Sequence, residues 1–480
     1  MAPPRAEERY RGRNIHVLGA AGTEGSAVID FLMRRGITSL TAHDLNAGGA
    51  FEAEFDRTHQ WLPPPERAEA LARLRAYGVP LHTGERYLEG LERADVIFVP
   101  QSWFRHPRNA PVRALRDRGV PLSSMTHLFF ETAPCPIIGV TGTNGKFTVA
   151  YLIHRMLERS GHRAHFSGND RSHVPVLYYA ERLRATDWLV LEISNRQLVG
   201  LPYSPHIGVI TNVAPHHLDD HGTFEAYIEV KRTLIAHQGP EDLAVLNADN
   251  PHTRAMAAAA RRPHLFSRLQ AVRPGAYLAD GRAVIARDAI EQTVPVDGMA
   301  VSGARMLENA LAALLAAALA GASAPAMAEV LADFRGLPYR ARVVGEHGGV
   351  RFIEDSLATN PAAAAAAVAE MDRPFVLIAG GARPTASTGD FAPLREALAR
   401  SPVRAILLIG ATAALLEEAL RELGRPLEGR ATLEAAVARA RQIARPGEAV
   451  LFSPACESFD QFRDYRERGD RFVALVEASR

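Results

Sequence analysis

Short apolar runs alternate with amphipathic stretches along most of the chain, and many of the runs end in polar or glycine-rich residues. Apolar runs of this length predict buried strands, and apolar residues spaced three and four positions apart predict helices. Their alternation favours an α/β fold with parallel sheets. The predicted strands cover residues 14–18, 39–42, 95–99, 188–193, 206–213, 243–247, 351–354, 375–379, 405–409 and 449–452, and the clearest helices cover residues 26–35, 303–320 and 324–334.

A chain of 480 residues is too long for one hydrophobic core, since single cores rarely grow beyond about 250–300 residues. The pattern predicts three α/β domains, at residues 1–134, 135–337 and 338–480. Residues 46–83 are charged and contain three consecutive prolines. We therefore expect them to form an insertion in the first domain, with one helix and loops.

The most informative stretch is the apolar run at residues 136–140 and the glycine-rich turn that ends at Lys146. Glycines let backbone N–H groups point at a polyphosphate, and the helix predicted after Lys146 adds positive potential. The layout predicts a variant phosphate-binding loop, and an ordinary glycine-rich turn is the alternative. The expected nucleotide contacts are Gly142, Thr143, Asn144, Gly145, Lys146 and Thr148, and Phe147 takes the place at which a strict loop has a Mg²⁺-binding hydroxyl.

A second glycine-rich turn, at residues 19–25, follows the first predicted strand, and the next strand ends at Asp44. This order resembles the opening of a dinucleotide-binding unit. The glycine spacing is not G-x-G-x-x-G, so a nicotinamide dinucleotide is a weak interpretation. A related fold could hold another nucleotide, such as a UDP group.

Polar residues also follow later strands, where open α/β sheets bind their ligands. Lys146, Glu192 and His217 could therefore converge on one crevice in the central domain. In the third domain, polar or glycine-rich residues follow the strands that end near residues 354, 379 and 452.

Composition narrows the class of protein. The chain is 47% hydrophobic and 23% charged, with a net charge of +1, so nothing favours nucleic acid or an anionic membrane as a partner. Two cysteines, Cys135 and Cys456, make neither a disulfide framework nor a metal site, and each is expected to be a small buried side chain. Residues 1–13 do not resemble a signal peptide, and we expect a cytoplasmic monomer.

Several motifs resemble the Mur ligase family. Residues 139–146, 191–194, 212–219 and Lys231 are similar to its central domain. Residues 336–340, 355–360 and 451–462 resemble the C-terminal domain of its glutamate-adding branch. The resemblance implies a Rossmann-like N-terminal domain that binds a UDP-sugar, a central ATP-binding domain like that of P-loop ATPases, and a Rossmann-like C-terminal domain that binds an amino acid.

The resemblance also implies a reaction and its substrates. ATP would activate the carboxylate of UDP-N-acetylmuramoyl-L-alanine as an acyl phosphate, which the amino group of glutamate then attacks. This is a step of peptidoglycan precursor synthesis. Mg²⁺ and cationic side chains would neutralise the triphosphate.

The family resemblance assigns a role to each matching residue. Lys146 is the phosphate-loop lysine, Thr148, Glu192 and His217 contact Mg²⁺, and Lys231 becomes a Mg²⁺ ligand after carbamylation by CO₂. Without the resemblance, Lys231 would be a solvated helix lysine and His217 a loop histidine. Further matches are Asn309, Arg340 and Asp355 around adenine, phosphate and ribose; Thr23, Asn169 and Ser194 around the UDP-linked substrate; and Thr359, Ser458, Phe459 and Tyr465 around the amino acid.

Some positions depart from the family pattern. Phe147 replaces a metal-binding hydroxyl, and Leu357 replaces a lysine that steadies the acyl phosphate. Arg383 could supply the missing cation. The rival hypotheses are a paralogous ligase that uses L-glutamate or another amino acid, a pseudo-ligase that only binds nucleotide, and a nicotinamide dehydrogenase.

Overall fold

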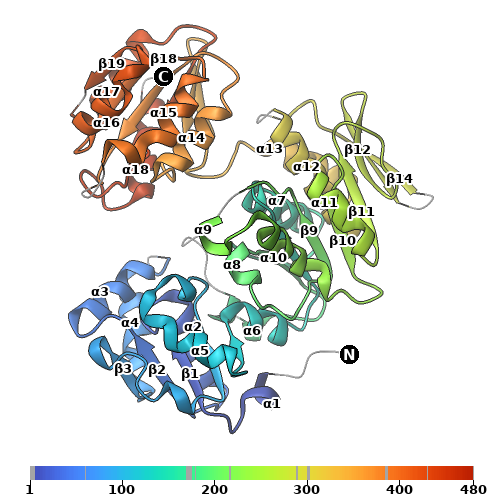
Figure 1. Cartoon of the computed structure of the whole chain (residues 1–480). Helices are drawn as coiled ribbons and strands as arrows, with labels where there is room; N and C mark the ends of the chain where they lie inside the picture. The colour runs from blue at the N-terminus through green and yellow to red at the C-terminus, as the bar shows by residue number, and fades with distance from the viewer. Residues whose placement is uncertain are drawn as a thin grey trace. The chain divides into compact units, whose positions relative to one another are not determined.

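The computed structural model describes residues 6–478 except 60, 169–175, 179, 216–217, 288–289, 300–302, 384–386 and 430. The chain forms two compact units, Met1–Asp333 and Phe334–Arg480, called here the first and second units. Three sheets with flanking helices account for most of the described structure, two in the first unit and one in the second (Figure 1). This is the α/β architecture that the alternating pattern predicts.

The N-terminal sheet has five parallel strands in the order β3-β2-β1-β4-β5. Segment 46–83 contains two helices and the edge strand β3 rather than one helix with loops, and the short strand β5 was also missed by sequence analysis. The strands are β1 Ile15–Leu18, β2 Leu40–Asp44, β3 Leu81–Thr83, β4 Val96–Phe98 and β5 Leu122–Ser123, and the helices are α1 Ala6–Tyr10, α2 Thr23–Arg34, α3 Gly49–Thr58, α4 Pro64–Ala76, α5 Ala110–Asp117 and α6 Met125–Thr132.

The second sheet of the first unit has the order β14-β13-β12-β11-β10-β9-β6-β8-β7. Strands β6 to β12 run parallel to one another, and β13 and β14 extend the sheet as an antiparallel arm. This arm and the strands β7, β11 and β12 lay outside the sequence prediction. The strands are β6 Ile137–Thr141, β7 Ala164–Ser167, β8 Trp188–Glu192, β9 Ile207–Ile210, β10 Leu243–Asn247, β11 Pro263–Ser267, β12 Gly275–Ala279, β13 Arg282–Arg287 and β14 Ile290–Pro295. The helices are α7 Lys146–Arg159, α8 Asn195–Leu198, α9 Leu218–His221, α10 Phe224–Ala236, α11 Pro251–Met256, α12 Ala304–Leu319 and α13 Ala324–Asp333.

The second unit contains a six-stranded sheet in the order β15-β16-β20-β17-β18-β19. Its strands are parallel except for the edge strand β15, which is antiparallel and lay outside the sequence prediction. The strands are β15 Arg342–His347, β16 Val350–Glu354, β17 Phe375–Gly380, β18 Val403–Ile409, β19 Leu427–Gly429 and β20 Ala449–Phe452, and the helices are α14 Pro361–Ala369, α15 Ala392–Ala399, α16 Ala413–Leu420, α17 Leu433–Ile443 and α18 Tyr465–Glu477.

Buried apolar strands fix where polar chemistry can occur. Strands β6, β9 and β10 are buried along their whole lengths, so their apolar side chains form core rather than sites. Polar groups collect instead at the carboxyl ends of parallel strands, in the loops that follow them. No helix in the described parts of the chain is long and apolar enough to cross a membrane.

Candidate functional site

The phosphate loop connects β6 to α7, as the sequence predicts. Gly142 and Gly145 have φ angles of 150° and 81°, which L side chains rarely adopt. A Cβ atom at Gly142 would lie 2.0 Å from Thr211 Oγ1, so a side chain cannot fit there. Lys146 Nζ donates to Gly142 O at 3.2 Å and Thr143 O at 3.0 Å, and thereby spans the loop.

The end of β9 holds this loop in shape. Thr143 N donates to Asn212 O at 2.8 Å, and Asn144 N donates to Asn212 Oδ1 at 3.0 Å. Thr211 Oγ1 in turn donates to Asn144 O at 2.6 Å. The chain's own hydrogen bonds therefore hold the loop in shape, which lowers the entropic cost of binding a ligand.

Asn309 lies against the same loop from α12. A Cβ atom at Gly145 would be 2.1 Å from Asn309 Oδ1, and Asn309 itself is buried. The structure therefore brings together two nucleotide-contact candidates that are more than 160 positions apart in the sequence.

Lys231 is buried beneath the phosphate loop. Its side chain is 0% exposed, so the interpretation as a solvated helix lysine is wrong. Lys231 Nζ donates to Thr141 Oγ1 at 3.0 Å and lies 5.3 Å from the centre of the Tyr227 ring. Burial lowers the pKa of Lys231 well below its usual value, and the Lys146 charge lowers it further, while Glu192 acts in the opposite direction.

These two lysines are the only ones in the chain, which otherwise uses arginine for its basic residues. Arginine keeps its proton and is bulkier, whereas a lysine amine can be neutral in a buried site. The two lysines thus occur where the phosphate loop needs a compact charge and where an amine is buried beneath it.

Phe147 faces the core rather than the loop. It is 7% exposed and packs edge-on against Phe166 at 5.2 Å between ring centres. Thr148, in the first turn of α7, is half-buried and carries the first hydroxyl after Lys146. Because Phe147 has no hydroxyl and points into the core, a hydroxyl ligand for a metal near the loop would have to come from another residue.

A cavity of about 460 Å³ lies in the first unit. It extends from the glycine turn at residues 19–25, at the carboxyl end of β1, to Glu192 at the end of β8. Thr23, predicted to contact the UDP-linked substrate, and Glu192, predicted to contact Mg²⁺, therefore line the same space. The strand order changes direction between β1 and β4, which is where open α/β sheets place ligands.

Ser194 joins the two sheets of the first unit. Its side chain caps α8 by accepting from Gln197 N, and its Oγ donates to Gln101 Oε1 at 2.9 Å. Gln101 N donates to Glu24 Oε2 at 2.7 Å. Burial raises the pKa of Glu24 to about 7. Sequence analysis missed Glu24 and Gln101, since only the folded chain shows that they face the cavity.

In the second unit, loops from neighbouring strands meet around Asp355. Asp355 follows β16, and its carboxylate accepts from Ser453 Oγ at 2.7 Å and Ala341 N at 3.1 Å. Burial raises the pKa of Asp355 to about 7. Buried Arg468 ties the same loops together by donating to Ser356 O, Cys456 O and Glu457 O.

The other predicted residues of the second unit differ in exposure. Ser458 is 2% exposed, whereas Phe459 is 64% exposed and presents an apolar ring to solvent. Tyr465 starts α18, with its ring edge-on to Tyr339 at 5.6 Å. Thr359 and Arg383 are half-buried, and Arg340 is exposed.

Two predicted site residues, Asn169 and His217, lie outside the described residues. Both cysteines are buried free thiols, as expected from their small number.

The parallel sheets and the phosphate loop define the class of protein as an α/β nucleotide-binding protein. Two family models match the chain: the Mur ligase middle domain at residues 140–317 and the glutamate ligase domain of Mur ligases at residues 339–456. The chain belongs to the Mur ligase family, and it is therefore a ligase.

Comparison with individual proteins gives the same family. The UDP-N-acetylmuramoylalanine–D-glutamate ligase of Symbiobacterium thermophilum is 39% identical over 464 residues, which cover 95% of this chain and 96% of the relative. Among solved structures, the UDP-N-acetylmuramate–alanine ligase MurC of Thermotoga maritima aligns with a TM-score of 0.53 and 17% identity, over 98% of this chain and 100% of that one. The MurF ligase of Thermotoga maritima in complex with ADP aligns with a TM-score of 0.52 and 18% identity, over 86% and 91% of the two chains.

Replacing Lys146 tests the phosphate loop. Lys146→Ala removes the one full charge that the loop itself carries, so we expect ATP turnover to fall by about a hundred- to a thousandfold with little change in melting temperature. Arg155→Ala is the matched control, because Arg155 lies on the same helix, is paired with Glu158 and is remote from the loop's carbonyl groups. Near-normal turnover by folded Lys146→Ala protein would contradict the nucleotide assignment.

Proposed function

We propose that the chain is an ATP-dependent ligase that joins D-glutamate to UDP-N-acetylmuramoyl-L-alanine. The observation that carries the proposal is the 39% identity to a D-glutamate ligase across nearly the whole of both chains. The preformed phosphate loop and the cavity that runs from the glycine turn to Glu192 supply the two ligand surfaces that the first unit would need.

The chemistry has two steps. An oxygen of the alanine carboxylate attacks the γ-phosphorus of ATP, and the bond to ADP breaks, which leaves an acyl phosphate. The amino nitrogen of glutamate then attacks the acyl carbon, and inorganic phosphate leaves as the amide forms. Lys146 would hold the phosphate oxygens during the first step, where negative charge is concentrated.

Glu192, Thr148 and Lys231 are the described residues that we propose around a Mg²⁺ site. Mg²⁺ prefers oxygen ligands, and within the described chain no group of three His, Cys, Asp or Glu side chains could hold a metal ion. Carbamylation of Lys231 by CO₂ would convert its amine into an anionic oxygen ligand beside Lys146. Bound Mg²⁺ would neutralise phosphate charge. His217, which lies outside the described residues, remains a proposed contact of the same site.

The second unit would bind the amino acid and supply further nucleotide contacts. Asp355 has the position at a strand end and the polar partners that suit a ribose contact, and exposed Arg340 suits a phosphate contact. Leu357 stands where the resembled family has a lysine, so Arg383 would supply the missing positive charge. A guanidinium suits this role because it binds two phosphate oxygens at once. Thr359, Ser458, Phe459 and Tyr465 would form the pocket for glutamate.

We also propose the three domains at residues 1–134, 135–337 and 338–480, and a monomeric cytoplasmic enzyme.

A nucleotide-binding pseudo-ligase is the rival hypothesis; membership of the ligase family is against it, and the lack of a hydroxyl at Phe147 is an observation in its favour. With that side chain packed on Phe166, one metal-binding hydroxyl of the resembled loop is missing. The two candidates differ in whether ATP is consumed only when both substrates are present.

A product assay separates these candidates. The protein is incubated with ATP, Mg²⁺, UDP-N-acetylmuramoyl-L-alanine and either D- or L-glutamate, and the products are resolved by mass spectrometry. We expect a conjugate with D-glutamate, together with one ADP for each amide bond formed. A product with L-glutamate alone would identify a paralogous ligase, and the absence of any conjugate would contradict the proposed function.

Carbamylation of Lys231 can be detected directly. With ¹³C-bicarbonate we expect one protein carbamate signal by NMR, which disappears in Lys231→Met and persists in Lys146→Met. Because the chain has two lysines, these variants account for every lysine amine. A signal that survives Lys231→Met would place the modification elsewhere, and an empty spectrum at saturating bicarbonate would contradict it.

A further inference from the structure

The C-terminal end of α3 is attached to the glycine turn at residues 19–25. Thr58 Oγ1 donates to Ala21 O at 3.0 Å, and Thr23 Oγ1 donates to Thr58 O at 2.7 Å. These hydrogen bonds join the insertion at residues 46–83 to the turn that opens the cavity. The end of α3 is therefore part of the cavity wall rather than a separate surface element.

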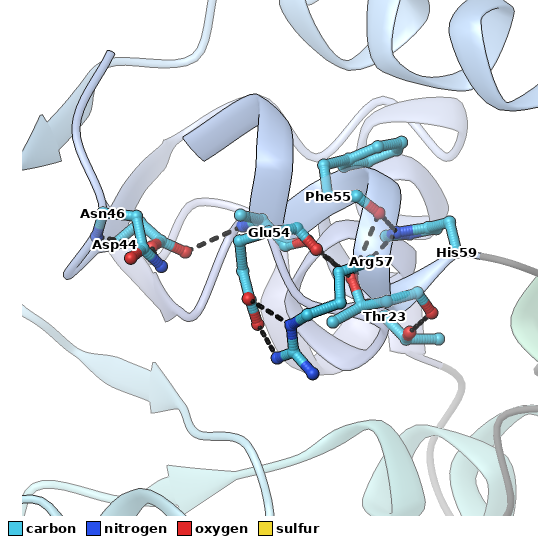
Figure 2. Close-up of polar contacts among 9 residues, drawn as sticks. Thr23, Asp44, Asn46, Glu54, Phe55, Arg57 and His59 are labelled. Atoms are coloured by element: carbon cyan, nitrogen blue, oxygen red, sulfur yellow. Dashed lines mark hydrogen bonds and ion pairs between the residues drawn. The ribbon is translucent and has the colours of Figure 1, made fainter. Parts of the chain in front are cut away.

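His59 fixes this end of α3 from the other side. It is 0% exposed, its Nε2 forms a 2.8 Å hydrogen bond with Ser26 Oγ of α2, and its ring stacks on Phe55 at 3.7 Å between ring centres. Its Nδ1 lies 2.8 Å from Phe55 O, and Figure 2 marks this contact with a dashed line. The backbone on either side of residue 58 is thus anchored, and the position of Arg57 is set with it.

Arg57 and Glu54 form an ion pair on the cavity side of α3. Arg57 Nε and Nη2 donate to the two Glu54 carboxylate oxygens at 2.8 and 2.6 Å, and Figure 2 shows the two side chains facing each other. Both residues line the cavity. The Arg57 side chain remains 50% exposed, so an entering ligand can reach it. The pair holds a guanidinium fork near the glycine turn.

The charge of the cavity makes this arginine important. Among the described residues that line it, Arg57 is the only lysine or arginine, whereas Glu24, Asp44, Glu54 and Glu192 contribute carboxyl groups. A diphosphate carries at least two negative charges and would be repelled by these carboxylates. A guanidinium binds two phosphate oxygens at once, which makes it a strong counterion for such a group.

We infer that Arg57 binds the diphosphate of the UDP-linked substrate by exchanging its Glu54 partner for phosphate oxygens. The inference rests on the proposed function for the identity of the ligand. The helix α3 then acts as an anion clamp built by residues 46–83, and Glu54 keeps the guanidinium oriented until the diphosphate binds. The clamp selects nucleotide-linked substrates over their uncharged nucleoside counterparts.

Calorimetric binding of UDP and of uridine tests the clamp without requiring catalysis. We expect Arg57→Ala to lower the affinity for UDP by about ten- to a hundredfold, as for a lost charged hydrogen bond, and to change the affinity for uridine less than twofold. Arg57→Lys should recover part of the UDP affinity. Glu54→Gln should raise it severalfold, because the competing carboxylate is gone.

Arg75→Ala is the matched control, since Arg75 pairs with Glu52 of α3 but does not line the cavity. Melting temperatures establish that each variant is folded. The clamp would be overturned if Arg57→Ala lowered the affinities for UDP and for uridine equally. It would also be overturned if Glu54→Gln lowered the affinity for UDP as much as Arg57→Ala does, because the ion pair would then have a structural role. If no ligation product forms but UDP still binds in a way that depends on Arg57, the proposed function is rejected and the clamp stands.

Discussion

Burial of the Lys231 amine beneath the phosphate loop is the constraint on which the central site depends. An ammonium removed from water costs several kcal/mol unless an opposite charge compensates for it. Lys231 contacts a hydroxyl and an aromatic ring, and the Lys146 charge acts against its protonation. Burial and the Lys146 charge therefore favour the uncharged amine over the ammonium, while Glu192 acts in the opposite direction. The presence of a lysine here, in a chain that otherwise uses arginine, agrees with that environment.

The rest of the chemistry follows from parallel strands that end at the same edge of a sheet. Within the second sheet, the ends of β6, β8 and β9 supply the phosphate loop, Glu192 and the asparagine that holds the loop. Within the N-terminal sheet, the reversal of strand order between β1 and β4 opens the cavity beside the glycine turn. In the second unit, Asp355 and Ser453 meet because β16 and β20 are neighbours. The same rule thus produces three polar sites from buried apolar strands.

Sequence patterns predicted what local periodicity encodes and missed what depends on long-range contacts. Strands β10 and β20 occur at the predicted residues, because each is a continuous apolar run. Strands β3, β5 and β19 have two or three residues, too few to show a period. The phosphate loop was predictable, because its glycines and its lysine lie close together in the sequence. The burial of Lys231 was not predictable, because a lysine side chain is usually exposed. Arg57 and Glu24 were missed because only tertiary contacts place them on the cavity.

The reaction, rather than the fold, is the central claim of this account, and oxygen transfer tests it most directly. The alanine carboxylate of the UDP-linked substrate is labelled with ¹⁸O, the ligation is run to completion, and the inorganic phosphate is examined by mass spectrometry. If an acyl phosphate forms and is attacked by glutamate, the C–O bond breaks and one labelled oxygen leaves with each phosphate. Unlabelled phosphate would contradict the account, because ATP would then have been cleaved without activating the carboxylate.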